Sequence, residues 1–134
     1  MTKEQLQEYR DLRQERDDIQ RQIEELEEAM YGPRSQRQDG MPRGGSGEND
    51  LREEQIDEKT KLLKMYQAKE AELAGKLLAI EQAIEKLNSR ERRLVRLHYI
   101  EGLTWEQVCV AMCYSWSQVH RYHRDALAKL RREG

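Results

Sequence analysis

Several side chains near the C-terminal end of the chain are of the types that read DNA bases: Trp116, Ser117, Gln118, His120 and Arg121. Gln118 offers a donor and an acceptor that match the major-groove edge of adenine, and Arg121 offers paired donors to guanine. Trp116 can either contact a thymine methyl group or cover the turn that precedes it. These residues can act together if they share the N-terminal part of one helix, because that part of a recognition helix enters the major groove.

The surrounding sequence predicts such a helix within a helix-turn-helix. Ser115 can cap a final helix. Its apolar face consists of Val119, His123, Ala126, Leu127 and Leu130. A shorter helix should start at Thr104, because Thr104 and Gln107 form a capping-box pattern, and it should end at the turn of Cys113 and Tyr114. Two helices joined by so short a turn are typical of a major-groove reader.

A further helix is expected before this pair. Asn88 or Ser89 can cap it, its apolar residues include Leu94 and Leu97, and Gly102 suits its C-terminal end. The C-terminal third of the chain is therefore expected to hold three helices, of which the last is long.

At these residues the chain resembles region 4 of the sigma-70 family of bacterial transcription factors and the phage regulators built on the same module. The matching positions are Leu87, Arg90, Glu91, Arg92, Arg96, Leu97, Tyr99, Gly102, Leu103, Thr104, Trp105, Glu106, Val108, Met112, Ser115, Val119, Arg124, Ala126, Leu127 and Leu130. Two residues depart from the family pattern. Cys113 replaces the glycine usual in the turn, and His123 takes a position that is usually leucine.

A closer resemblance is to small phage-encoded sigma-like proteins, related to late-gene activators and autolysin regulators. These place a charged coiled-coil region and a Gly/Pro-containing linker ahead of the same module. The MPRGG sequence from Met41 to Gly45, the Leu-Thr-Trp-Glu start of the second helix and the Arg-x-His-x-x-Ala-Leu ending fit that group.

The resemblance implies roles for individual residues. Trp116, Ser117 and Arg121 match positions that face bases, and Gln118 joins them by its chemistry. Phosphate contacts set the register of a protein on the duplex without reading its sequence. We expect such backbone contacts from Arg90, Arg92, Arg93, Ser115, His120 and Arg124.

Two upstream segments, Thr2 to Met30 and Ile56 to Leu87, contain seven-residue repeats typical of coiled coils. Neither helix can bury its apolar stripe alone, so the two could fold back as an antiparallel hairpin or pair between chains. We favour pairing between chains, and hence a homo-oligomer. The seam residues expected in that interface are Tyr9, Leu12, Ile19, Ile23, Leu26, Leu63, Tyr66, Leu73, Leu77, Ile80 and Ile84.

Charged residues interrupt both repeats. Arg16 occupies a seam position of the first, and Lys59 and Glu70 occupy seam positions of the second. A charge buried in a seam is costly unless it is paired, and such residues often fix register or partner choice. Arg16 and Glu70 have opposite charges and can pair with each other.

The expected fold is all-α, a long helical coiled-coil arm or hairpin followed by the helix-turn-helix. Residues 1–31 should form an N-terminal coiled-coil helix and residues 50–88 a long second one. Residues 32–49 are rich in Gly and Pro, which helices and strands tolerate poorly, so they predict a flexible, disordered linker. Residues 89–134 should form the DNA-binding domain.

Charge is distributed unevenly along the chain. Residues 90–134 contain nine Lys/Arg and five Asp/Glu, whereas the rest contains 15 and 21. A locally basic segment gains free energy from counterion release on DNA, while an acidic arm should point away from the duplex. The composition, 37% hydrophobic and 37% charged, leaves little to fill a broad core, so the arrangement should be extended.

The remaining sequence features concern location. No apolar run is long enough for a membrane span, and the N-terminus lacks the apolar stretch of a secretory signal. The two cysteines are consistent with a reducing compartment. We therefore expect a protein of the cytoplasm of a bacterial host cell that does not contact a membrane.

Cys109, Cys113, His120 and His123 provide the ligand types of a zinc site, but their spacing does not fit a zinc finger. Cys109 and His123 are better explained as core residues. We expect no metal and no cofactor. The carboxylates lie on solvent-facing helix positions and no Ser, His and Asp set has an activating context, so we do not expect an enzyme.

The sequence thus predicts a sequence-specific transcriptional regulator that binds double-stranded DNA. By resemblance it would act on late genes of a phage, with host RNA polymerase as a further partner. One alternative is the small DNA-recognition subunit of a phage packaging machine, which also joins a helix-turn-helix to an oligomerising coiled coil. Another is an interaction protein whose helix-turn-helix binds RNA polymerase without reading DNA.

Overall fold

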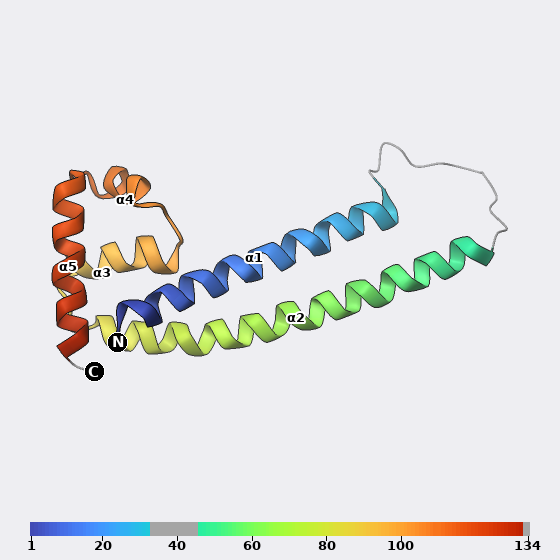
Figure 1. Cartoon of the computed structure of the whole chain (residues 1–134), viewed down its shortest axis with the longest axis horizontal. Helices are drawn as coiled ribbons and strands as arrows, with labels where there is room; N and C mark the ends of the chain where they lie inside the picture. The colour runs from blue at the N-terminus through green and yellow to red at the C-terminus, as the bar shows by residue number, and fades with distance from the viewer. Residues whose placement is uncertain (33–45, 133–134) are drawn as a thin grey trace. The chain divides into compact units, whose positions relative to one another are not determined.

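The computed structural model describes residues 1–32 and 46–132, with side chains from residue 51 onward in the second range (Figure 1). Its elements are the helices α1 (Lys3–Tyr31), α2 (Ser46–Ile84), α3 (Ser89–Val95), α4 (Trp105–Met112) and α5 (Trp116–Arg132), with a π-helical turn, η2 (Arg96–Ile100), between α3 and α4. Within the described residues there is no strand, so the expected all-α class is confirmed. None of the described helices has the length and apolar character that crossing a membrane requires.

The chain divides into two compact units, and helices α1 and α2 contribute to both. Unit 1 consists of Met1–Gln14 and Ala71–Gly134, and unit 2 consists of Glu15–Glu70. The first turns of α1 therefore belong to the same unit as the C-terminal helices α3, α4 and α5. The organisation expected from the sequence, with a separate domain starting at residue 89, does not follow this division.

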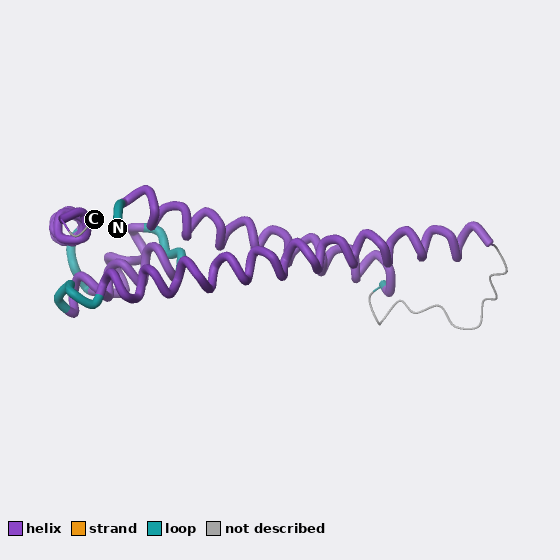
Figure 2. The backbone as a smooth tube through the Cα atoms, turned by 90° about the horizontal axis from the view of Figure 1, so that it is seen from below, coloured by secondary structure: helices purple, strands orange, loops and turns teal. Residues whose placement is uncertain are grey.

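Unit 1 has a core to which α1, α2, α3, η2 and α5 all contribute. Its buried residues are Leu6, Tyr9, Leu12, Leu73, Ile80, Ile84, Leu87, Val95, Tyr99, Ala126 and Leu130. Leu6, Ile84, Ala126 and Leu130 are completely buried. Figures 1 and 2 show the N-terminal turns of α1 beside the C-terminal end of α2. Removing α1 from unit 1 would therefore expose apolar residues of the C-terminal helices.

Polar contacts of α1 strengthen this core. Arg10 donates from Nε to the carbonyl oxygen of His98 (3.1 Å) and from Nη2 to that of Gly102 (3.3 Å). Arg13 donates from Nη1 to the carbonyl oxygen of Glu101 (2.9 Å). Carbonyls at the end of a helix have no partner within it and favour positive charge. Arg10 and Arg13 thus supply partners for the segment that leads into α4.

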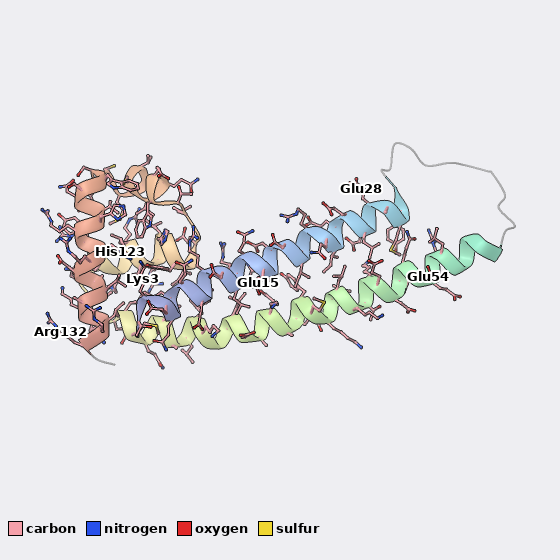
Figure 3. All side chains as sticks on the ribbon, viewed as in Figure 1. Lys3, Glu15, Glu28, Glu54, His123 and Arg132 are labelled. Carbon is pink, nitrogen blue, oxygen red and sulfur yellow. The ribbon has the colours of Figure 1, made fainter. Side chains whose placement is uncertain are left out.

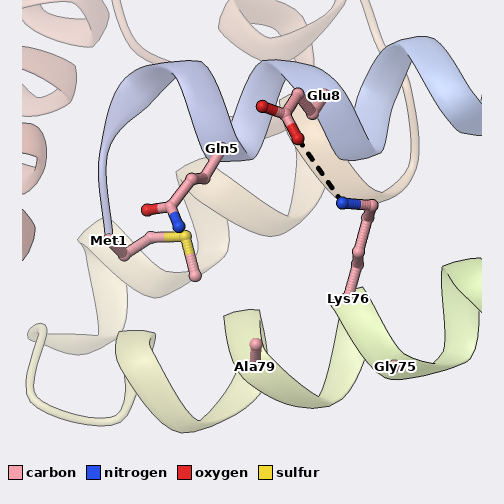
Figure 4. Close-up of a pocket in the computed structure, with 6 residues that line it drawn as sticks. All are labelled: Met1, Gln5, Glu8, Gly75, Lys76 and Ala79. Carbon is pink, nitrogen blue, oxygen red and sulfur yellow. Dashed lines mark hydrogen bonds and ion pairs between the residues drawn. The ribbon is translucent and has the colours of Figure 1, made fainter.

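The seam between α1 and α2 in unit 1 is flanked by a groove with a volume of about 250 Å³ (Figure 4). Gly75 and Ala79 leave space on the α2 side, and Gln5 lies on the α1 side. The ion pair between Lys76 and Glu8, 3.4 Å from Nζ to Oε2, crosses between the two helices there. Glu8 is 62% exposed and Lys76 is 34% exposed, so solvent screens the pair and it contributes little to stability.

Unit 2 is a pair of helical segments with a thinner core. Ile19, Ile23 and Met30 of α1 are buried. Arg16 Nη1 lies 2.7 Å from Glu70 Oε1, which confirms the expected pairing of these two seam residues. The third seam charge, Lys59, lies 2.8 Å from Glu27, so all three charges that interrupt the apolar repeats are paired within one chain.

Most of the predicted seam residues are buried or half-buried within a single chain. Tyr9, Leu12, Ile19, Ile23, Leu73, Ile80 and Ile84 are buried, Leu26, Tyr66 and Leu77 are half-buried, and Leu63 is 39% exposed. Within each unit, the segments of α1 and α2 thus pack against each other, as in the antiparallel hairpin that the sequence left as an alternative. Pairing between chains stays a prediction, since Leu63 remains exposed and three seam residues are only half-buried within one chain.

The segment between the two long helices differs from the expected linker at one end. Helix α2 begins at Ser46, within the predicted linker and four residues before the predicted start at Asp50. The predicted flexibility of residues 33–45 lies outside the described residues. Helix α2 ends at Ile84, and a turn leads to the N-cap of α3 at Asn88.

Candidate nucleic-acid interface

Helices α4 and α5 form the predicted helix-turn-helix, and side chains fix both of their starts. The Thr104 hydroxyl accepts from the Gln107 backbone N–H (3.2 Å), and the Gln107 side chain accepts from the Thr104 N–H (2.9 Å). Helix α4 ends at Cys113, which has a left-handed backbone with φ 59° and ψ 39°. This conformation favours glycine and costs other residues about 1–2 kcal/mol. The turn keeps its geometry although Cys113 replaces the usual glycine.

Helix α3 is held by a buried charge. Asn88 and Glu91 form a capping box, so of the two candidate caps, Asn88 and Ser89, the structure uses Asn88. Glu91 is 3% exposed, and both of its carboxylate oxygens accept from Lys129 Nζ of α5 at 2.9 Å. A buried carboxylate needs such a partner, because an unpaired charge there is strongly destabilising. The ion pair therefore ties α3 to the C-terminal half of α5.

The π-helical turn η2 was not foreseen from the sequence. It ends at Glu101, and Gly102 follows with a positive φ of 80°. A Cβ atom at Gly102 would lie 2.7 Å from Nη1 of Arg13, so both the backbone and the contact with α1 favour glycine. The expected placement of Gly102 at a helix end is confirmed.

A second apolar cluster, the helix-turn-helix core, positions α5 against α3, η2 and α4. Its buried members are Leu94, Leu97, Val108 and Val119. Leu103, Trp105, Cys109, Met112, Tyr114 and Tyr122 pack around them. Because residues from all of these elements interlock here, the orientation of α5 is fixed within unit 1.

The rings of Trp105 and Tyr99 and two buried histidines meet next to this core. Trp105 stacks on His98 with a centroid distance of 3.7 Å, and it lies 4.5 Å from His123. His98 Nδ1 bonds to the carbonyl oxygen of Leu103 (2.8 Å), and His123 Nε2 bonds to the Tyr99 hydroxyl (2.7 Å). Burial lowers the pKa of both histidines to about 4. Both are therefore neutral at pH 7, and His123 (Figure 3) is the satisfied core histidine that was expected.

His120 is placed differently from the phosphate contact that the resemblance implied. Its ring lies between Trp105, at 5.0 Å, and Trp116, at 4.3 Å. Nε2 is buried and has no hydrogen-bond partner among the described residues. A phosphate contact through Nε2 would require the ring to leave this position. Trp116 packs on His120 while remaining 52% exposed, so packing leaves about half of its surface available for a base contact.

Gln118 and Ser115 form a third capping box. The side-chain oxygen of Gln118 accepts from the Ser115 N–H (2.9 Å), and the Ser115 hydroxyl accepts from the Gln118 N–H (3.1 Å). A two-point contact to adenine needs that same oxygen, so it competes with the cap. The sequence contained this signal, because Ser115 and Gln118 have the same types and spacing as Thr104 and Gln107. The side chain of Gln118 is therefore committed to the start of α5 in this structure.

The other predicted DNA contacts lie on exposed parts of α3 and α5. Ser117, Arg121 and Arg124 are exposed on α5, and Arg90 and Arg93 are exposed on α3. Arg92 is half-buried and donates from Nη1 to the carbonyl oxygen of Leu87 (2.5 Å), which occupies part of its guanidinium.

Tyr122 is a residue that sequence reasoning missed. The guanidinium carbons of Arg90 and Arg121 lie 4.1 Å and 5.3 Å from its ring centroid. The structure thus brings a predicted backbone contact from α3 and a predicted base contact from α5 to the same ring.

The residues considered for zinc do not form a site. Within residues 1–32 and 46–132, no group of three or more His, Cys, Asp or Glu side chains is arranged to hold a metal ion. Cys109 is half-buried against the helix-turn-helix core and Cys113 is exposed in the turn, both as free thiols.

Comparison with known protein families agrees with this geometry. Residues 83–132 match the family model for Sigma-70, region 4. The matched segment begins near the end of α2 and covers α3, η2, α4 and α5. No curated protein and no solved structure showed a significant match. The C-terminal part of the chain is therefore a sigma-70 region 4-like helix-turn-helix, a DNA-binding module.

Proposed function

We propose that this protein, whose residues 83–132 form a sigma-70 region 4-like module, is a sequence-specific transcriptional regulator of phage type that acts on late genes. The observation that supports it most is the surface of α5. Its first turns expose Ser117, Arg121, Arg124 and about half of Trp116, while the opposite face is fixed in the two apolar clusters. A rigid helix with exposed arginines is suited to the major groove.

In this proposal the two helices have separate tasks. Arg121 reads a base, since an arginine can make a two-point contact with guanine, and Ser117 and Trp116 lie close enough in sequence to contact neighbouring bases. Arg90, Arg93 and Arg124 contact phosphates and set the register. Gln118 and His120 act indirectly by holding the start of α5 in place.

The proposal extends to partners and location. Helix α2 exposes Leu51, Ile56, Leu63 and Met65 by 39 to 55% in unit 2. Such apolar surface on a chain with a mean hydropathy of −1.07 supports association with a second copy of the chain. We place the regulator in the cytoplasm of a bacterial host, with host RNA polymerase as a further partner and no catalytic role.

The test is the selection of bound duplexes from a random DNA library by the full chain at near-physiological salt. The same selection is run with the double variant Ser117→Ala, Arg121→Ala and with a control variant, Arg21→Ala. Arg21 is 61% exposed in unit 2 and pairs with Asp18, so the control removes one arginine away from α5. One enriched sequence motif, lost in the double variant and retained in the control, supports the proposal. No enrichment by the wild-type chain refutes sequence reading.

A second candidate function is an interaction module that binds RNA polymerase without reading DNA. Val110 on α4 favours it, because this apolar side chain is 79% exposed. The two functions separate under charge reversal at Arg121 and Arg124. If the wild-type chain binds no duplex, and polymerase binding survives charge reversal at both arginines, the interaction module is favoured. Polymerase binding lost with Val110→Asp would locate its contact on α4.

A further inference from the structure

The ring of Tyr122 is contacted from three other positions in unit 1. Arg90 comes from the first turn of α3, and Arg121 precedes Tyr122 on α5. Tyr114, from the turn between α4 and α5, meets the ring at a centroid distance of 5.4 Å with an interplanar angle of 66°. Tyr122 is also packed against the helix-turn-helix core, which leaves its ring little freedom to turn.

The two arginines on this ring keep their donors available. Among the residues that the structure describes, Arg90 and Arg121 both make a cation–π contact with the ring of Tyr122. A guanidinium that lies over an aromatic face is held by its charge and its plane, while its N–H groups remain free for an oxyanion or a base edge. Arg92, on the same helix as Arg90, instead spends a donor on the carbonyl of Leu87.

We propose that Tyr122 is a positioning residue for DNA binding: its ring holds Arg90 of α3 and Arg121 of α5 in one arrangement, so that both engage the same duplex as a pair. This inference rests on the proposed DNA-binding function. A free arginine side chain loses rotamer freedom when it binds, and this loss weakens binding. The ring restricts two arginines before the duplex arrives. The phosphate contact of Arg90 and the base contact of Arg121 are thereby coupled through Tyr122, which itself contacts neither the phosphate nor the base.

The test measures affinity for a fluorescein-labelled duplex that carries the motif selected by the wild-type chain. Tyr122→Leu removes the aromatic face, and Tyr122→Phe keeps it and removes only the hydroxyl. We expect the Phe variant to bind nearly as tightly as the wild type and the Leu variant to bind roughly tenfold more weakly. Unfolding followed by tryptophan fluorescence reports whether either variant loses the fold of the helix-turn-helix.

A double-mutant cycle separates positioning from packing. Arg90→Ala is measured in the wild type and in the Tyr122→Leu variant. Arg93→Ala serves as the matched control, because Arg93 is exposed on α3 and has no recorded contact with the ring. We expect the effect of Arg90→Ala to shrink when the ring is absent and the effect of Arg93→Ala to stay the same. A merely structural role of Tyr122 would change both effects alike.

Equal affinities of the Phe and Leu variants would overturn the proposal, as would an effect of Arg90→Ala that is independent of the ring. If Tyr122→Leu does not fold, the salt dependence of the Arg90→Ala variant decides. Loss of one phosphate contact lowers the slope of log affinity against log salt by about 0.9, and an unchanged slope overturns the proposal. A wild-type chain that binds no duplex refutes the proposed function itself, which distinguishes that failure from failure of the positioning role alone.

Discussion

Replacement of Leu6 by alanine should destabilise the DNA-binding module, although Leu6 is distant in sequence from that module. Leu6 is completely buried in the cluster that includes Ala126 and Leu130 of α5. Truncating a fully buried leucine costs roughly 2–5 kcal/mol, because apolar contacts are lost and a cavity remains. For a unit of this size the midpoint of thermal unfolding should fall on the order of 10 °C or more.

Tryptophan fluorescence is the suitable assay, because the two tryptophans of the chain, Trp105 and Trp116, both lie in the helix-turn-helix. Their signal reports on this module and not on unit 2. Leu78→Ala is the matched control, since Leu78 lies in the same unit and is 61% exposed. Its loss should cost less than about 1 kcal/mol.

The result that would refute this reasoning is a fluorescence transition that is equally stable in Leu6→Ala and in Leu78→Ala. The helix-turn-helix would then fold independently of α1. The same reasoning predicts that a fragment limited to residues 83–132 does not fold alone. That fragment lacks Leu6, Tyr9 and Leu12, whose burial is worth about 1.5–3 kcal/mol each against a typical total stability of about 5–15 kcal/mol.

Three further predictions concern groups inside the module. His98 and His123 have a pKa of about 4 in the folded chain against an ordinary value of 6.5, so on acidification the unfolded chain binds protons first. The free energy of unfolding should therefore be at its full value above pH 6.5 and fall by up to about 3 kcal/mol for each histidine as the pH drops to 4. Urea midpoints measured across this pH range check the prediction, and a flat profile would contradict it. Lys129→Met leaves the carboxylate of Glu91 buried without its cation and should lower the free energy of unfolding in urea by about 2–4 kcal/mol. Lys129→Arg, or the double variant Lys129→Met with Glu91→Gln, should recover most of this loss, and equal stability of the single and double variants would speak against the ion pair. Gln118→Ala should cost about 0.5–1 kcal/mol of stability and leave the selected DNA motif unchanged, while Gln118→Glu keeps the capping box; a motif that changes in the Ala variant would show that the glutamine reads a base.

Local signals in the sequence were sufficient for the helix-turn-helix. Capping residues act within four positions of each other, so the Thr104 box could be assigned from neighbouring residues alone, and the cap of α3 could be narrowed to Asn88 or Ser89. The heptad repeats likewise predicted that Arg16 and Glu70 could meet, because a seam position on one helix must face a seam position on the other.

The docking of α1 on the C-terminal helices could not be predicted in this way. Leu6 lies one position out of the heptad register that runs through Tyr9 and Leu12, so the repeat gave it no role. A repeat describes which residues of one helix share a face, but it does not identify the distant element that covers a residue outside that face. Arg10 and Arg13 were unassigned for the same reason, since their acceptors are backbone carbonyls without a sequence signature.

The predicted base contacts changed for a related reason. Side chains suited to bases are also suited to building the helix that presents them. Gln118 has the amide for adenine, but the same amide completes a capping box, and His120 has a donor for phosphate, but its ring fills the space between two tryptophans. The first turn of a helix that follows a tight turn has N–H groups without partners within the helix, so its start needs such internal supports. The predicted base contacts that remain exposed near its start are Trp116, Ser117 and Arg121, and the guanidinium of Arg121 lies 5.3 Å from the ring centroid of Tyr122. If α5 reads DNA as proposed, it therefore does so with few side chains that are held in place, rather than with many flexible ones.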